Sequence, residues 1–260
     1  LVPESNPPSN IHVLIGRNGV GKTRLLNGMT RALVDPKTRT TRDGKFEFRD
    51  SPFELVGDSS EKFANLVSVT FSAFDDFLSI ETTGNRATEI IRYTNIGLRR
   101  RIQRKDGTTN IITLNPERLG SDFAASAAIC TLGERGRRWK RALRTLESDP
   151  IFDEAEVASL ADVDDEEEFH DKARALYKGL SSGHKIVLLT ITKLVQLVEE
   201  RSLVLMDEPE AHLHPPLLSA FIRALSDLLI NRNGVAIIAT HSPVVVQEVP
   251  TTCVWKIFRH

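Results

Sequence analysis

The chain has 260 residues, a net charge of −1 and 40% hydrophobic residues. This length suits one large domain or a core domain with an insertion, and the balanced charge leaves only local contacts with nucleic acid. Cys130 and Cys253 lack metal-like spacing, and no apolar run approaches the ~18 residues that a membrane span needs. We predict two inert buried thiols, a cytoplasmic protein and no membrane partner.

A short apolar run at residues 11–15 predicts a buried strand, and residues 24–34 have the apolar spacing of a helix. Between them, residues 16–23 read Gly-Arg-Asn-Gly-Val-Gly-Lys-Thr and fit the pattern G-x-x-x-x-G-K-[ST]. Glycines let the backbone approach phosphate oxygens, and the backbone N–H groups with the helix N-terminus form an anion site. The strand–loop–helix context therefore predicts a phosphate-binding P-loop.

The P-loop side chains have separate expected roles. Lys22 adds a positive charge to the β- and γ-phosphates, and the Thr23 hydroxyl is a ligand for Mg²⁺. The residues that we predict to bind the nucleotide are Gly16, Asn18, Gly19, Gly21, Lys22, Thr23 and Arg24. We also expect Lys22 to act in catalysis.

The middle of the chain carries weaker signals. Residues 35–50 are polar and turn-rich, which predicts a connection, and residues 66–71 predict a second strand. The runs 89–93 and 110–114 also resemble strands, and Lys105-Asp106-Gly107 between them predicts a hairpin.

Helix-forming residues dominate the next segment, which we interpret as a helical subdomain inserted into an α/β core. The predicted divisions are 1–119 for the first half of the core, 120–178 for the insertion and 179–260 for the second half. A basic run at Arg135–Arg144 and an acidic run at Asp162–Glu168 are more typical of solvated faces. The alternative is that the basic run, with Arg99–Arg101, contacts nucleic acid phosphates or an acidic partner.

The second half alternates between helices and strands. Residues 186–200 predict a buried helix, 203–206 a buried strand, 215–231 a helix, 235–239 a buried strand and 253–258 an edge strand. This alternation predicts an α/β fold with a largely parallel sheet, whose ligands bind at the carboxyl ends of the strands.

Two carboxylates, Asp207 and Glu208, follow the strand at 203–206 in the Walker B pattern. Asp207 is expected to hold Mg²⁺, and Glu208 to orient or deprotonate the attacking water. The alternative is an ordinary acidic loop after a core strand.

Two further motifs flank this pair. Ser181, Ser182 and Gly183 precede a buried helix, where hydroxyls, free N–H groups and the helix dipole favour an anion, although alone they would predict only an N-cap. His241 follows the strand at 235–239 and can donate a hydrogen bond to a γ-phosphate oxygen, although a lone histidine is more often structural.

The four motifs together resemble an ABC-type ATPase head, over residues 11–34 and 178–258. The run Glu208–Pro215 (Glu-Pro-Glu-Ala-His-Leu-His-Pro) is more specific. It resembles the ABC-like AAA ATPases of the OLD-nuclease and phage-defence group rather than transporter subunits. Within that group the chain most resembles the PtuA-type ATPases of Septu and retron systems, which work with an HNH nuclease subunit.

The resemblance implies that the chain hydrolyses ATP with Mg²⁺ as a homodimer that closes on ATP. It also implies that these dimers assemble into a higher oligomer. The P-loop, Asp207, Glu208 and His241 of one subunit would bind one face of ATP, and Ser181–Gly183 of the other subunit would cover the γ-phosphate. An HNH-type nuclease is the implied partner. The alternatives are an ATPase of the RecF or SMC kind that acts directly on DNA, a transporter motor, and a scaffold without turnover.

The chain departs from the family pattern in two places. The glutamine expected after the second strand is absent, and Asp75 or Asp76 is the substitute that we consider. No aromatic residue precedes the P-loop to stack on adenine. His212 and His214 have the residue types of metal ligands, but two ligands are too few, so we assign them to a loop at the dimer interface.

Overall fold

A six-stranded parallel sheet organises the computed structural model, which describes residues 8–34, 44, 46, 63–71, 91–103, 109–113 and 115–258. In spatial order its strands are β3 (Arg92–Gly97), β2 (Asn65–Thr70), β6 (Ser202–Asp207), β7 (Val235–Thr240), β1 (Ile11–Ile15) and β8 (Val254–Lys256). The predicted α/β class is confirmed, and the last strand lies at the sheet edge as expected.

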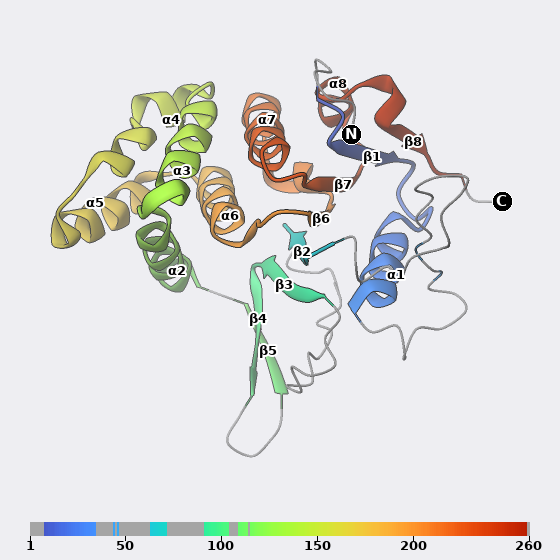
Figure 1. Cartoon of the computed structure of the whole chain (residues 1–260), viewed down its shortest axis with the longest axis horizontal. Coiled ribbons are helices and arrows are strands. Elements are labelled where there is room, and N and C mark those ends of the chain that lie inside the picture. Colours follow the sequence, from blue (N-terminus) through green and yellow to red (C-terminus); the bar gives the residue numbers. More distant parts are fainter. Residues whose placement is uncertain are drawn as a thin grey trace.

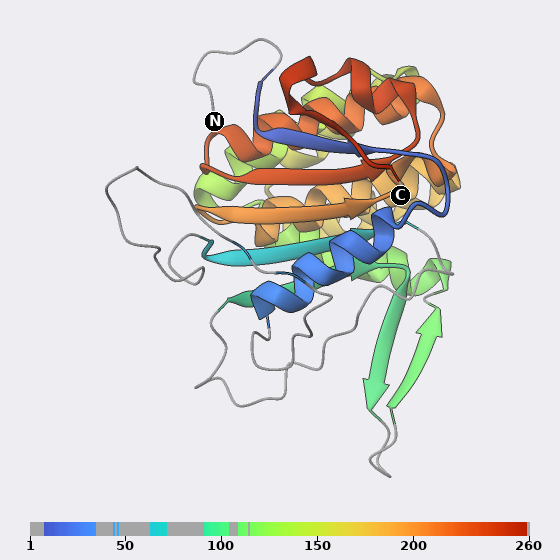
Figure 2. The same cartoon turned by 90° about the vertical axis from the view of Figure 1, so that its right-hand side faces the viewer.

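Helices cover both faces of this sheet (Figure 1, Figure 2). The α-helices are α1 (Lys22–Val34), α2 (Pro116–Cys130), α3 (Gly133–Leu146), α4 (Pro150–Glu154), α5 (Glu166–Gly179), α6 (Ser182–Leu197), α7 (Pro215–Ile230) and α8 (Pro243–Gln247). Within the described residues the 3₁₀ turns are η2 (Val157–Asp162), η3 (Pro209–His212) and η4 (Thr251–Cys253). Of the described helices, α1 covers one face, and α6 and α7 cover the other with α2 to α5 beyond them.

Strand β6 is buried at every position because both of its faces are covered. Leu203 and Leu205 join the apolar cluster under α1, whereas Val204 and Met206 join the cluster under α6 and α7. Side chains alternate between the two faces of a strand, so a fully apolar strand is what a doubly covered sheet requires.

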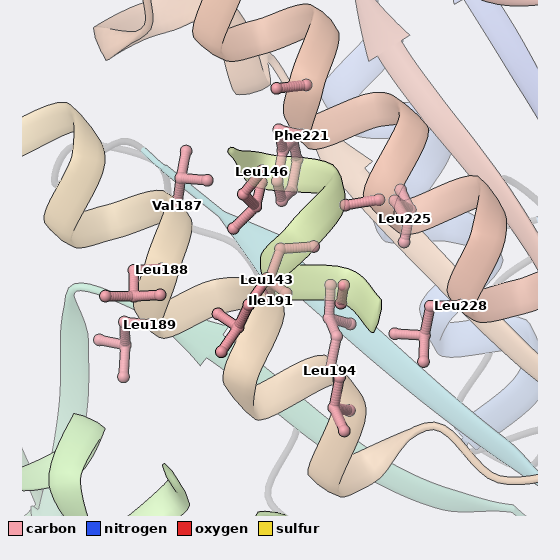
Figure 3. Packing of buried hydrophobic residues seen from close by; sticks show 14 of the residues in the cluster. Leu143, Leu146, Val187, Leu188, Leu189, Ile191, Leu194, Phe221, Leu225 and Leu228 are labelled. Atoms are coloured by element: carbon pink, nitrogen blue, oxygen red, sulfur yellow. The ribbon is translucent and has the colours of Figure 1, made fainter. Parts of the chain in front are cut away.

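Helices α2 to α5 share their buried core with α6 and α7. Leu143 and Leu146 of α3 lie between α6, near Ile191, and α7, near Phe221 (Figure 3). The buried indole of Trp139 donates a hydrogen bond to Thr192 Oγ1 of α6 at 3.0 Å. This continuous packing joins residues 116–179 to the sheet; the predicted domain boundaries stay a prediction.

The prediction of the first strand of the hairpin is wrong. Strand β4 (Arg99–Gln103), not residues 89–93, pairs antiparallel with β5 (Thr109–Thr113), and the hairpin extends away from the sheet. Strand β3 instead pairs parallel with β2, and its Ile96 is buried in the main core. Three consecutive arginines concealed β4, since strand propensity favours β-branched and aromatic residues. The predicted turn at 105–107 lies outside the described residues.

Among the described helices, none is both long and apolar enough to cross a membrane.

We expect the substitution Leu143→Ala to lower the free energy of unfolding by about 2–5 kcal/mol, because it leaves a cavity between α3, α6 and α7. Leu132→Ala is the matched control, since Leu132 is 72% exposed and Leu143 is 1% exposed. The control should change stability by no more than about 0.5 kcal/mol. Urea unfolding measures both, and equal effects would contradict a shared core.

Candidate nucleotide-binding site

The loop between β1 and α1 has the backbone that a phosphate cradle needs. Gly19 and Gly21 have φ angles of 79° and 101°, in the left-handed region that favours glycine. At Gly16 a Cβ would lie 2.9 Å from Val20 Cγ2 and 3.0 Å from the carbonyl oxygen of Ile257. Three of the predicted glycines are therefore required by the geometry itself.

Lys22 is buried at the start of α1 and contacts three oxygens. Its ammonium donates to the carbonyls of Gly16 at 3.1 Å and Arg17 at 3.4 Å, and it lies 3.4 Å from Glu208 Oε1. The structure thus brings the P-loop lysine to the carboxylate that follows β6. The nearby Thr23 is partly buried in the first turn of α1, and Asn18 and Arg24 are exposed.

Asp207 and Glu208 lie beside the P-loop because the parallel strands end in register. Ile15 pairs with Thr240 and Asp207 pairs with Ala239, so β1, β7 and β6 end at the same edge. The Asp207 side chain is buried as the last residue of β6. Glu208 adopts a left-handed conformation with φ at 42°, and its N–H donates to the Ala239 carbonyl at 2.8 Å. Such a conformation in a non-glycine residue costs about 1–3 kcal/mol and is concentrated at functional sites.

Glu210 holds His241 in place, a role that the sequence did not reveal. Its Oε1 accepts hydrogen bonds from Thr240 Oγ1 at 2.6 Å and from the His241 backbone N–H at 2.8 Å. The same oxygen lies 3.1 Å from His241 Nδ1, which is also 3.7 Å from Glu208 Oε1. The signal was the second carboxylate of Glu-Pro-Glu, which the turn η3 brings back toward β7.

The segment Ser181–Gly183 lies against the loop after β6 of its own chain. A Cβ on Gly183 would lie 2.8 Å from the carbonyl oxygen of His212. Ser181 is the N-cap residue of α6 but makes no side-chain cap, and its Oγ lies 2.6 Å from His184 Nδ1. Ser181 and Ser182 are both exposed. An ordinary N-cap thus does not account for Ser181.

The basic run on α3 is largely engaged in ion pairs. Arg137 pairs with Glu134, Lys140 pairs with Asp162, and Arg141 Nε lies 3.9 Å from Asp227. Burial, together with neighbouring Arg232 and Arg135, lowers the pKa of Arg138, whose guanidinium donates to the Val198 carbonyl at 3.2 Å. These contacts favour a structural face over a surface for nucleic acid phosphates. The side chains of Arg99–Arg101, and Asp75 and Asp76, lie outside the described part.

An exposed aromatic ring follows the strand next to the P-loop. Ile257 donates its N–H to the Ile15 carbonyl at 2.8 Å, and Phe258, the next residue, is 64% exposed. No local sequence pattern links Phe258 to the P-loop, because Phe258 comes from the other end of the chain.

We expect Gly183→Ala to lower the free energy of unfolding by about 1–3 kcal/mol, because the new methyl group displaces the His212 carbonyl. Gly179→Ala is the matched control, since nothing lies within 4 Å of its Cβ position. Alanine is more favourable than glycine in a helix by up to about 1 kcal/mol, and this gain opposes the destabilisation from the clash. The control measures the gain without the clash. Denaturant unfolding of both variants decides the point, and a Gly183→Ala protein as stable as the control would contradict the close approach.

Comparison with known proteins agrees with this architecture. Residues 132–247, which include the Ser181–Gly183 segment, Asp207, Glu208 and His241, match the family described as "AAA domain, putative AbiEii toxin, Type IV TA system". The chain is 44% identical over 275 residues to Protein ea59 of Escherichia phage lambda, a match that covers 98% of this chain and 50% of that protein. The chain thus spans about half the length of the curated relative. The matched domain and the parallel sheet with its P-loop show an α/β P-loop NTPase fold and support a P-loop ATPase of the AAA/ABC type.

Proposed function

We propose that the chain binds and hydrolyses ATP as a homodimer that closes on ATP, and that it thereby regulates or assembles a partner nuclease in an anti-phage defence complex. The convergence of Lys22, Glu208 and His241 at one edge of the sheet is the observation that supports ATP hydrolysis. Lys22 lies 3.4 Å and His241 lies 3.7 Å from the same carboxylate oxygen of Glu208.

The residues at this edge fit a nucleoside triphosphate with Mg²⁺. The left-handed glycines of the P-loop have open space beside them, as a phosphate cradle requires. A γ-phosphate would replace Glu208 as the partner of Lys22, and Glu208 could then orient the attacking water. Thr23 and Asp207 would hold Mg²⁺, which neutralises charge on the phosphates. His241, held by Glu210, would donate a hydrogen bond to the transferred group.

A second copy of the chain would complete the site. Ser181 and Ser182 are exposed at the N-terminus of α6, a 16-residue helix. Free N–H groups and the positive end of the dipole make such a terminus favourable for a phosphate. Gly183 packs on His212 of its own chain, so this segment and the loop after β6 form one continuous surface for a partner.

The resemblance of the run Glu208–Pro215 to phage-defence ATPases supports the nuclease partner. The 44% identity to a phage protein is compatible with a setting in which phage and host compete.

We expect Glu208→Gln to reduce steady-state ATP hydrolysis by about 10²-fold or more, because the amide cannot accept a proton from water. ATP binding should persist, so dimers should accumulate in ATP–Mg²⁺. Phosphate release and light scattering after size-exclusion chromatography measure the two effects. Equal hydrolysis by wild type and variant would remove Glu208 from catalysis.

Ser182→Glu is the matched control for the dimer, since the exposed carboxylate would repel a phosphate without touching the P-loop. It should bind ATP and remain monomeric, and an ATP-dependent dimer in this variant would contradict closure through the Ser181–Gly183 segment.

We further expect a nuclease subunit to copurify with Glu208→Gln protein from its native host when ATP–Mg²⁺ is present, because the variant holds the closed dimer. Mass spectrometry of the purified complex identifies the subunit, with the Ser182→Glu protein as the control. Recovery of a lone dimer, with neither nuclease nor nucleic acid, would contradict the proposed partner.

A further inference from the structure

Three potential metal ligands from distant parts of the sequence meet beside the Ser181–Gly183 segment. Asp149 precedes α4, His184 lies in the first turn of α6, and His214 precedes α7. One ligand atom from each lies within 4.8 Å of the other two. The sequence offered only His212 and His214, whereas the fold supplies two partners for His214 and leaves His212 out of the cluster.

The two imidazoles flank the carboxylate of Asp149. His184 Nε2 lies 3.0 Å from Asp149 Oδ1, and His214 Nε2 lies 3.7 Å from Asp149 Oδ2. The two rings are 5.4 Å apart between centroids. Phe152 packs edge-on against His184 at 4.9 Å, which fixes the ring on its apolar side. The cluster is therefore held by packing on one side and by the loop of His214 on the other.

Asp149 is the unusual member of this cluster because its side chain has no exposed surface. Its Oδ1 accepts a hydrogen bond from the Ile151 N–H at 3.1 Å in addition to the contact with His184. Its Oδ2 is buried and has no hydrogen-bond partner among the described residues. A buried carboxylate with an unsatisfied oxygen is costly, and a cation between it and the imidazoles would remove that cost.

We propose that Asp149, His184 and His214 bind a divalent transition metal ion of the Zn²⁺ class. Two imidazole nitrogens and one carboxylate oxygen form a ligand set that Zn²⁺ uses, with a fourth position left for water or another ligand. Ligands about 2.0–2.2 Å from a tetrahedral ion lie roughly 3.3–3.6 Å apart. His184 Nε2 lies 3.0 Å from Oδ1 and His214 Nε2 lies 3.7 Å from Oδ2, so each imidazole is near this spacing from a different oxygen of Asp149. The side chain of His214 is 47% exposed, which gives the ion an entry path.

Metal binding fixes where each imidazole carries its proton. A ligating Nε2 must be unprotonated, so a neutral His184 carries its proton on Nδ1 and donates it to Ser181 Oγ, 2.6 Å away. Without the ion, His184 donates from Nε2 to Asp149, and Ser181 donates to Nδ1. A neutral His214 that ligates through Nε2 likewise carries its proton on Nδ1, so it gives up the 3.4 Å hydrogen bond that Nδ1 accepts from the Leu217 N–H.

The ion would therefore reverse the hydrogen bond between Ser181 and His184, and the Ser181 hydroxyl proton would become available to a phosphate. This consequence for Ser181 rests on the proposed ATP-sandwich function, whereas the metal site itself does not.

The test uses the whole chain after removal of any affinity tag, stripped with a chelator and titrated with Zn²⁺ in the absence of nucleotide. We expect one Zn²⁺ per chain by elemental analysis and a rise in Tm, because an ion that binds only the folded state stabilises it. Co²⁺ in place of Zn²⁺ should give the visible absorption of a low-coordinate nitrogen and oxygen site.

His214→Ala should weaken Zn²⁺ binding at least tenfold and abolish the Tm rise, while His212→Ala should leave both unchanged. His212 is the matched control because it is an exposed histidine two positions away in the same loop. Excess Mg²⁺ should not displace the Zn²⁺, which separates this site from the one at Thr23 and Asp207. Absence of stoichiometric Zn²⁺, or equal effects of the two substitutions, would overturn the proposal. Neither readout depends on ATP hydrolysis, so failure here is distinct from failure of the proposed ATPase.

Discussion

The ammonium of Lys22 is buried, and its need for oxygen partners ties together residues that are far apart in the chain. It is 4% exposed and contacts two P-loop carbonyls and the Glu208 carboxylate. A buried charge is tolerated only with such partners, so the P-loop and the end of β6 must be formed together. The parallel register of β1, β7 and β6 makes this possible, because it aligns the ends of the three strands.

The short segment after β6 contacts nearly every other part of the site. Glu208 meets Lys22, Glu210 holds His241, the His212 carbonyl touches the position of Gly183, and His214 approaches Asp149. The left-handed backbone at Glu208 and the turn η3 allow the chain to reverse immediately after the strand. One reversal thus directs alternate residues, three through their side chains and His212 through its carbonyl, to the P-loop, β7, α6 and the region beyond α6.

Local patterns were sufficient to predict the central elements. Apolar runs identified β1, β6 and β7, and the glycine spacing identified the P-loop, because burial on both faces of a sheet and a left-handed loop each leave a direct trace in the sequence. The start of α6 was placed four residues late, at 186 instead of Ser182, since Ser-Gly-His-Lys has no apolar periodicity.

Contacts between distant parts of the chain have no comparable local sequence pattern. Glu210 reaches Thr240 across 30 residues, and His184 reaches Asp149 across 35, and neither spacing belongs to a helix or a strand. The hairpin partner β4 was missed for a related reason, because pairing with β5 overrides the weak strand propensity of its three arginines.

Gly183 has a mechanical consequence. With only a hydrogen atom between the backbone of α6 and the His212 carbonyl, no side chain is present there to change rotamer and absorb a displacement. A shift of the loop after β6 must therefore move the first turn of α6. That helix is about 24 Å long at 1.5 Å per residue, and Thr192 in its far half contacts Cys130 of α2 and Trp139 of α3. Helix α6 is thus a rigid rod that carries a movement at the nucleotide edge toward Leu197, close to the start of β6.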